Sequence, residues 1–382
     1  MSLRMRARAP TSRDESRTAT GQSRWFAPGR VNVIGDHTDY QAGWVLPFAV
    51  AEGATVKVEV NDTSRVEITS TEFGTAPSCA MEELGRGSRG WSAYIDGALV
   101  ITQDLGIKVG GARISVESDL TSGAGVASSA AVTCATIAAV MQASGQTVEP
   151  TDVAVLAQRV ENEYLGAGVG YMDPAASMFG RSGYALLIDT RWRTIEPVRC
   201  ALDEGEVRLL LIDSGVPHAT SGAEYAVRVA QCREAASLLG VDALRDISNP
   251  DLLTTLGDPV LRARARHVVT ENARVLAVAD LLRAGRVRDI GTYLTASHAS
   301  LRDDFDVSTP ALELIVNTAM DAGALGARVT GAGFGGAALV LVDNRLTESV
   351  RAALSEAFER QGWQPGKIRE VRPSAGARPL AD

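Results

Sequence analysis

Apolar and polar residues alternate in several short stretches of the chain. The pattern is clear in GATVKVEV (53–60), RVEITST (65–71) and ARISVESDL (112–120), and it predicts strands. Two apolar stretches, GYALLIDT (183–190) and VRLLLIDSG (207–215), predict further strands on either side of a polar connection.

Stretches with helical periodicity lie between and after these strands. The predicted helices of the first half cover residues 91–106, 130–144 and 152–166. The second half alternates amphipathic helices, such as TESVRAALSEAFERQG (347–362), with ARVTGAGFGGAALVLVD (327–343), a glycine-rich turn that leads into an apolar strand. KIREVRP (367–373) is the last predicted strand. The mixture predicts an α+β protein with mixed sheets rather than a regular βαβ series.

The length of 382 residues is sufficient for two domains. We place the boundary in the polar connection, which divides the chain into residues 24–195 and residues 196–382. Residues 1–23 are rich in Arg, Ser and Thr and lack the apolar segment of a secretory signal, so we expect a disordered tail.

Composition and charge narrow the functional classes. The net charge of −8 disfavours a nucleic-acid partner, and the basic run around Arg262, Arg264 and Arg266 has the periodicity of a solvated helix face. The four cysteines and four histidines show no disulfide or zinc-ligand spacing. No apolar stretch approaches the length of a membrane span. We therefore expect a cytoplasmic protein.

The stretch TSGAGVASS (121–129) has the features of an anion site. Gly123 and Gly125 allow a close approach of the backbone to a ligand, and a helix that begins near Ser128 offers free N–H groups to phosphate. From these residues alone, a tight turn with a serine cap is an equal alternative. The chain contains no GxxxxGK[ST] stretch, and the acidic residue of a dinucleotide-binding βαβ unit is missing.

The densest group of ionisable residues lies between Gly29 and Pro47, in GRVNVIGDHTDYQAGWVLP. With TSGAGVASSA from Thr121 and TGAGFGGA from Thr330, this stretch resembles the galactokinases of the GHMP kinase superfamily. Their corresponding motifs are close to GRxNLIGEHTDYNxGxVLPxA, PxGxGLSSSA and TGAGFGGC. GVGYMDPAASMFG, HATSGAEYAVRVAQCREA, RARHVVTENARVL and SHASLRDDFDVS also resemble galactokinase sequence.

The resemblance implies a two-domain GHMP kinase fold, with a ribosomal-S5-like N-terminal domain, a ferredoxin-like C-terminal domain and the active site between them. It implies ATP-dependent phosphorylation of D-galactose at the anomeric hydroxyl, the step that opens galactose catabolism in the Leloir pathway, with Mg²⁺ as cofactor. The expected partners are these small molecules, without nucleic acid or membrane, and the expected assembly is a monomer or weak homo-oligomer.

The resemblance also assigns roles to individual residues. Asp173 matches the catalytic base, and Arg30 the arginine that keeps this base ionised and offsets charge in the transition state. The sugar would contact Arg30, Asp36, His37, Asp39, Gly170, Asp173 and Tyr225. ATP would contact Gly123, Ala124, Gly125, Val126, Ala127, Ser128 and Ser129, and the metal ligands would be Ser129 and Glu161.

Four positions depart from the family pattern. Asp36 stands where galactokinases have Glu, Pro174 where Gln is usual, Thr121 where the phosphate motif begins with Pro, and Ala127 where it has its first Ser. Two alternatives follow: a GHMP kinase for another sugar, such as N-acetylgalactosamine or arabinose, and a non-catalytic sensor of galactose and ATP. Intact Ser128, Ser129, Asp173 and Arg30 disfavour the sensor.

Overall fold

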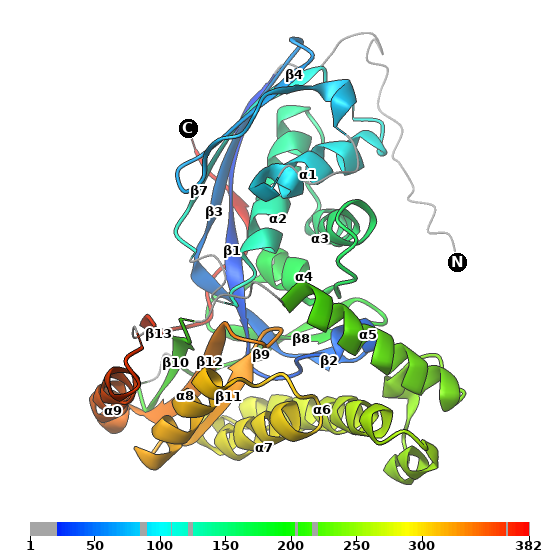
Figure 1. Ribbon diagram of the computed structural model, residues 1–382. Helices are drawn as coiled ribbons and strands as arrows, with labels where there is room; N and C mark the ends of the chain where they lie inside the picture. Colours follow the sequence, from blue (N-terminus) through cyan, green and yellow to red (C-terminus); the bar gives the residue numbers. More distant parts are fainter. Residues whose placement is uncertain are drawn as a thin grey trace.

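The structure is a computed structural model that describes residues 21–84, 90–107, 109–120, 125–202, 205–215, 221–363 and 366–381. It has two layered parts (Figure 1). In the first part, long strands lie against a group of helices, and in the second part a shorter sheet is covered by helices from the second half of the chain.

The first sheet is built around three long antiparallel strands. Its spatial order is β14 (Arg378–Pro379), β1 (Gln22–Asn32), β3 (Pro47–Asn61), β7 (Gly111–Ser118), β4 (Arg65–Ser70) and β5 (Gly74–Thr75), with β6 (Cys79–Ala80) paired to β4. Val56, Val58 and Val60 of β3 are buried, whereas Lys57 and Glu59 form an ion pair on the opposite face. The period-two pattern thus directs alternate residues to the core.

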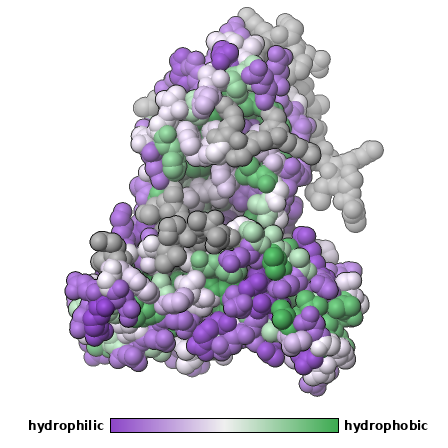
Figure 2. All heavy atoms as spheres, viewed as in Figure 1, coloured by the Kyte–Doolittle hydropathy of each residue, from purple (hydrophilic) through white to green (hydrophobic). Residues whose placement is uncertain are grey.

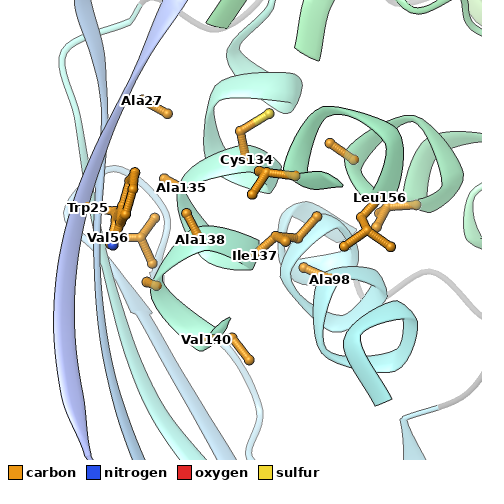
Figure 3. Packing of buried hydrophobic residues seen from close by; sticks show 14 of the residues in the cluster. Trp25, Ala27, Val56, Ala98, Cys134, Ala135, Ile137, Ala138, Val140 and Leu156 are labelled. Carbon is orange, nitrogen blue, oxygen red and sulfur yellow. The ribbon is translucent and has the colours of Figure 1, made fainter. Parts of the chain in front are cut away.

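Four helices cover the inner face of this sheet: α1 (Ala93–Gln103), α2 (Ser128–Ala143), α3 (Pro150–Arg159) and α4 (Met172–Phe179). Helix α2 is buried on nearly every side, which its many alanines permit. In Figure 3, Ala135 and Ala138 of α2 lie toward Val56 of the sheet, and Ile137 lies toward Ala98 of α1. This packing fixes the beginning of α2 at the lower end of the first part.

The second sheet has the antiparallel order β11 (Gly326–Thr330), β12 (Ala337–Asp343), β10 (Val207–Asp213) and β13 (Ile368–Glu370). Its helices are α5 (Ser221–Leu238), α6 (Pro259–Arg283), α7 (Ile290–Asp303), α8 (Pro310–Asp321) and α9 (Thr347–Arg360). This order is that of a ferredoxin-like βαββαβ unit. Asp258 caps α6 by accepting from the Val260 N–H, and Pro259 occupies the first turn, where no donor is needed.

Of the three clusters of buried hydrophobic side chains among the described residues, one spans both parts. Leu209 and Leu211 of β10 pack in the same cluster as Val31 and Phe48 of the first sheet, while Leu210 faces the helices on the other side. A third sheet, β2 (Trp44–Val45), β8 (Tyr184–Asp189) and β9 (Thr194–Arg199), lies at this junction. The two halves of the chain are therefore held together by apolar burial as well as by the connecting segment.

The end of the chain returns to the first part of the molecule. Ser374 donates to the Ala49 carbonyl, Ala377 donates to the Ser177 carbonyl, and β14 pairs with β1 in register Trp25 to Pro379. This short strand lies beyond the last strand expected from the sequence. The domain division at residues 195 and 196 stays a prediction.

Most predicted elements lie within a few residues of the observed ones, and the α+β fold class is confirmed. The predicted helix 152–166 ends in a single π-helical turn, Val160–Tyr164. Of the predicted tail, residues 1–20 lie outside the described residues, whereas β1 begins at Gln22. The solvated face expected around Arg262 is wrong for Arg264, which is buried and donates to the Gln231 side chain and the Asp304 carbonyl.

Hydrophilic residues cover much of the face shown in Figure 2, interrupted by smaller hydrophobic areas. Among the described residues, no helix combines the length and the apolar character that crossing a bilayer requires. All four cysteines are free thiols in the structure.

The shared core predicts that the two parts unfold together. Phe48→Ala removes a fully buried ring from the shared cluster, so we expect the free energy of unfolding to fall by ~3–5 kcal/mol. Urea unfolding followed by circular dichroism and by tryptophan fluorescence measures this. Leu238→Ala, at a side chain that is 64% exposed, should change the free energy by less than ~0.5 kcal/mol. Two separate transitions, of which one is unshifted by Phe48→Ala, would contradict a common core.

Candidate active site

The segment from the end of β1 to the first residue of β2, residues 33–44, is named the polar loop here. Three of its residues have positive φ angles: Gly35 (+102°), His37 (65°) and Ala42 (56°). A left-handed conformation costs a non-glycine residue roughly 1–2 kcal/mol, so His37 and Ala42 store strain. Such strain persists only where surrounding contacts hold the backbone.

The polar loop forms one wall of a cavity of about 520 Å³ between the two parts. The other walls come from the segment 161–173, from the beginning of α2 and α5, and from the turn after β11. The predicted site residues that line it are Arg30, Asp36, His37, Asp39, Ser129, Glu161, Gly170, Asp173 and Tyr225. With Tyr94 of α1, which also lines the cavity, residues from seven separate stretches of the sequence, spread over both parts of the molecule, meet at one place.

Arg30 and Asp173 form a bidentate ion pair at the centre of the cavity. Arg30 Nε lies 2.7 Å from Asp173 Oδ1, and the second Nη lies 2.8 Å from Oδ2. The Arg30 side chain is 7% exposed, whereas that of Asp173 is 30% exposed. The arginine is therefore fixed within the protein, and the carboxylate it holds remains open to a ligand.

Asp39 lies against the backbone of Gly170. A Cβ atom built on Gly170 would come within 1.9 Å of Asp39 Oδ2, so only glycine fits at this position. Burial, with a further contribution from the charge of Asp173, raises the pKa of the Asp39 carboxyl from 3.8 to about 7. Tyr225 also faces this region, and burial raises the pKa of its hydroxyl well above 10, so that it remains a hydrogen-bond donor.

Glu161 lies on the π-helical turn, close to the first turn of α2. Ser129 donates a hydrogen bond to its carboxylate, and the Tyr94 hydroxyl hydrogen-bonds with Ser129 in turn. Burial and the charge of Asp173 raise the pKa of Glu161 to about 8. Among the described residues there is no group of three His, Cys, Asp or Glu side chains that could hold a metal by themselves.

The beginning of α2 presents backbone N–H groups that make no helical hydrogen bond. The first helical bond runs from Ala131 to the Ala127 carbonyl, so Ser128, Ser129 and Ala130 have no partner within the helix. Ala127 has a left-handed conformation and provides no side-chain cap. Arg30 holds the preceding turn, because its N–H donates to the Val126 carbonyl and its Nη1 to the Gly125 carbonyl. Gly123 and Ala124 lie outside the described residues.

Asp36 and His37 make their polar contacts within the protein. The buried Asp36 carboxylate accepts from the Arg328 guanidinium and, at 3.0 Å, from the Gly331 N–H. Burial lowers the pKa of His37 to about 3, so the ring is neutral. Because a carbonyl only accepts, Nε2 donates to the Ala332 carbonyl (3.1 Å), and Nδ1 accepts from the Tyr40 hydroxyl (3.0 Å).

Sequence reasoning missed Arg328 and the residues of a second hollow. Arg328 is fully buried. The signal for it in the sequence is a charged residue within the otherwise uncharged strand β11. The second hollow, about 170 Å³, is lined by Phe73 and Trp91, whose rings stack with centroids 5.6 Å apart. Tyr94 and Ser129 line both the cavity and this hollow, so the two spaces adjoin. Pro174 lies in the first turn of α4 and does not line the cavity.

The raised pKa of Asp39 predicts a pH-dependent stability. Between pH 3.8 and about pH 7 the folded protein binds a proton that the unfolded chain has released, so stability falls as the pH rises through this range. Asp39→Asn removes the buried charge, and we expect its melting temperature, relative to the wild type, to rise between pH 5 and pH 8. Scanning fluorimetry without substrates measures this. Asp62→Asn, at an exposed carboxylate, is the control. Parallel melting curves for Asp39→Asn and the wild type across this range would contradict the prediction.

Three family models match the chain. They are the galactokinase galactose-binding signature at residues 17–60, the GHMP kinase N-terminal domain at residues 93–181 and the GHMP kinase C-terminal domain at residues 278–360. The chain is 43% identical to the galactokinase of Streptomyces coelicolor over 93% of this chain and 94% of that protein. It is 40% identical to the galactokinase of Mycobacterium tuberculosis, over 92% of this chain and 97% of that protein.

Solved structures agree with these matches. The galactokinase of Lactococcus lactis, crystallised with galactose, superposes with a TM-score of 0.88 at 29% identity and covers 94% of this chain and 95% of its own. The mevalonate kinase of Methanococcus jannaschii superposes with a TM-score of 0.65 at 19% identity, over 94% of this chain and 99% of its own, which indicates a common fold. The fold, the cavity and the sequence matches lead to one conclusion: this chain belongs to the galactokinase family of the GHMP kinases.

Proposed function

We propose that the protein transfers the γ-phosphoryl group of ATP to the anomeric hydroxyl of D-galactose, giving galactose 1-phosphate. The observation that carries the proposal is the bidentate pair of Arg30 and Asp173 in the cavity beside the beginning of α2. A fixed, partly open carboxylate next to an anion-binding helix end suits proton removal coupled to phosphoryl transfer. The identity of the sugar is inferred from the family and from the relative that was crystallised with galactose.

Asp173 acts as the general base. Each oxygen accepts one hydrogen bond from Arg30 and retains a lone pair for the sugar hydroxyl. The same guanidinium offsets negative charge that develops as the hydroxyl attacks phosphorus. Because Arg30 also donates to the Gly125 carbonyl, it keeps the base at a fixed position relative to the phosphate turn.

The nucleotide binds from the second hollow to the beginning of α2. The stacked rings of Phe73 and Trp91 offer an apolar surface for the base, and the free N–H groups at Ser128 and Ser129 offer donors to the phosphates. Tyr94 and Ser129 lie where the two spaces adjoin, which is the position that the transferred phosphoryl group must occupy. Of the predicted ATP contacts, Gly125, Val126 and Ala127 form the adjoining turn.

Ser129 and Glu161 fit a magnesium ion carried by the phosphates. Both are oxygen ligands, and the carboxyl groups of Glu161 and Asp173 lie close enough that the charge of Asp173 adds to burial in raising the pKa of Glu161. Mg²⁺ commonly takes one or two protein ligands and completes its shell with phosphate and water. When bound, it would neutralise charge on the transferred phosphoryl group.

The sugar site divides into two kinds of residue. Asp39, Tyr225 and the backbone of Gly170 face the cavity and offer acceptors and donors to sugar hydroxyls. Asp36 and His37 also line it, and their polar side-chain atoms already have protein partners. Asp36 would contact the sugar with a remaining lone pair of its carboxylate, whereas both ring nitrogens of His37 are engaged. The cytoplasmic location, supported by the free thiols, is part of the proposal. The state as a monomer or weak homo-oligomer stays a prediction.

The direct test is ADP release with MgATP and a panel of galactose, talose, arabinose, glucose and N-acetylgalactosamine. We expect galactose to be the preferred substrate. Asp173→Asn should lower kcat by ~10²–10⁴-fold, because the amide cannot accept the proton. Calorimetric binding of galactose should change little. Absence of turnover on galactose by the wild type would refute the proposed activity, and wild-type turnover by Asp173→Asn would remove this residue from the base role.

The contact between Gly170 and Asp39 gives a second test. Gly170→Ala places a methyl group where Asp39 lies, so we expect kcat/KM for galactose to fall by ~10²-fold through misplacement of a sugar ligand. Gly222→Ala is the matched control, because Gly222 lines the same cavity, lies in the first turn of α5 and has no atom within 4 Å of a Cβ built on it. Equal activities of the two variants would show that the position of Asp39 does not matter.

A further inference from the structure

Helix α6 contacts the polar loop from the side opposite the cavity. Three of its side chains, His267, Glu271 and Asn272, are buried and form hydrogen bonds with backbone groups of this loop. They come from the stretch RARHVVTENARVL, to which the resemblance assigns no role. None of the three lines the cavity.

His267 holds the residue that precedes His37. Its Nε2 donates to the Asp36 carbonyl at 3.1 Å. Burial lowers the pKa of His267 to about 4, so the ring is neutral; its Nδ1 lies 2.9 Å from the Ser300 hydroxyl, whose oxygen also lies 3.0 Å from Asp304 Oδ2. Because the Asp36 carbonyl only accepts, the contact with the loop requires the tautomer that carries its proton on Nε2.

Glu271 and Asn272 hold the two ends of the loop. Glu271 Oε1 accepts from the Gly35 N–H at 3.0 Å and from Ser297 at 2.7 Å, while Oε2 pairs with Arg274. Asn272 Oδ1 accepts from the Trp44 N–H at 2.7 Å, and its amide donates to the α6 backbone. Both side chains are oriented by neighbours within the second part of the molecule.

These three contacts act on the strained part of the chain. Gly35, His37 and Ala42, with their positive φ angles, lie within the segment that the three side chains hold. The same segment carries Asp39, whose carboxylate has Gly170 directly against it. A loop with stored strain would relax if its outside contacts were removed, and relaxation would displace Asp39 first, because it lies midway between the held ends.

We propose that His267, Glu271 and Asn272 are positioning residues for the sugar: they hold the polar loop in the strained conformation that presents Asp39 to the cavity. The inference rests on the proposed function for its substrate. It assigns the affinity for the sugar partly to a helix of the second part that does not touch the ligand. ATP binding, which uses α2 and the second hollow, should be independent of these contacts.

The test compares His267→Phe, His267→Gln and His298→Phe. Phenylalanine keeps the ring and removes the donor to Asp36, whereas glutamine places an N–H close to the position of Nε2. His298 is a matched control, because it is also buried, lies on α7 and contacts Glu313 instead of the polar loop. We expect His267→Phe to raise KM for galactose about tenfold, the effect of one lost buried hydrogen bond, with KM for ATP unchanged.

His267→Gln should recover most of the affinity, and His298→Phe should leave both KM values unchanged. Asn272→Leu, which removes the acceptor for Trp44, provides a second variant should His267→Phe fail to fold, and it should also raise KM for galactose alone. KM values for galactose that are equal in the wild type and in folded His267→Phe and Asn272→Leu, which are called the loop-side variants, would overturn the inference. A wild type without activity on galactose would instead refute the proposed function.

Hydrogen exchange gives a measurement that does not depend on catalysis. The amides of Gly35 and Trp44 donate to α6, so the peptide spanning the polar loop should exchange slowly in the wild type and faster in Asn272→Leu and His267→Phe. His298→Phe should leave exchange in this peptide unchanged. Unchanged protection of the polar loop in the two loop-side variants would also overturn the inference.

Discussion

The buried ion pair between Asp36 and Arg328 is the contact on which the arrangement of the cavity depends. Arg328 is fully buried on β11, and it also donates to the Val33 carbonyl. One guanidinium thus holds two positions, Val33 and Asp36, in the first part of the polar loop. Burial lowers its pKa to about 9, which leaves it charged at neutral pH. Removing either partner would leave an uncompensated charge in the shared core, at a cost of ~3–5 kcal/mol. The other Asp36 oxygen accepts from the Gly331 N–H. The pair therefore also joins the polar loop to the turn after β11, which belongs to the second part.

The electrostatics of the cavity follow from its unequal charges. Among the described residues that line it, Arg30 is the cation, and it faces Asp173, Asp39 and Glu161. Of these three, Asp173 is the one paired directly with Arg30. Burial and the charge of Asp173 raise the pKa values of Asp39 and Glu161. A site of this kind holds protons when empty and exchanges them for hydroxyl donors and cations when occupied. Under the proposed function, the same imbalance of charge would favour a polyhydroxylated substrate and the cation that the nucleotide carries.

The motifs of the sequence led to residues that lie together in the structure, because glycine turns and short polar clusters are local features; the roles of these residues stay predictions. Arg30, Asp39, Gly170, Asp173 and Tyr225 do meet in one cavity, and α2 begins at Ser128. The partners of Asp36 and His37 could not be predicted, since the Arg328 side chain and the Ala332 carbonyl lie about 295 residues away along the chain. The expectation that Arg264 is solvated was wrong for a related reason. Helical periodicity identifies a polar face, but it does not show which other helix covers that face. Pairing of β14 with β1 involves two residues, too few to leave a pattern.

That last pairing has a consequence for how the chain is made. In the first sheet β1 lies between β3 and β14, so one edge of β1 has no strand partner until residues 378 and 379 are available. During synthesis the first part of the molecule would thus expose an open strand edge while the whole second part is still being added. Open edges are sites where strands of other chains can pair. Residues 378 and 379 cover this edge at Trp25 and Phe26, and removing them would act on aggregation during biosynthesis before it acted on catalysis.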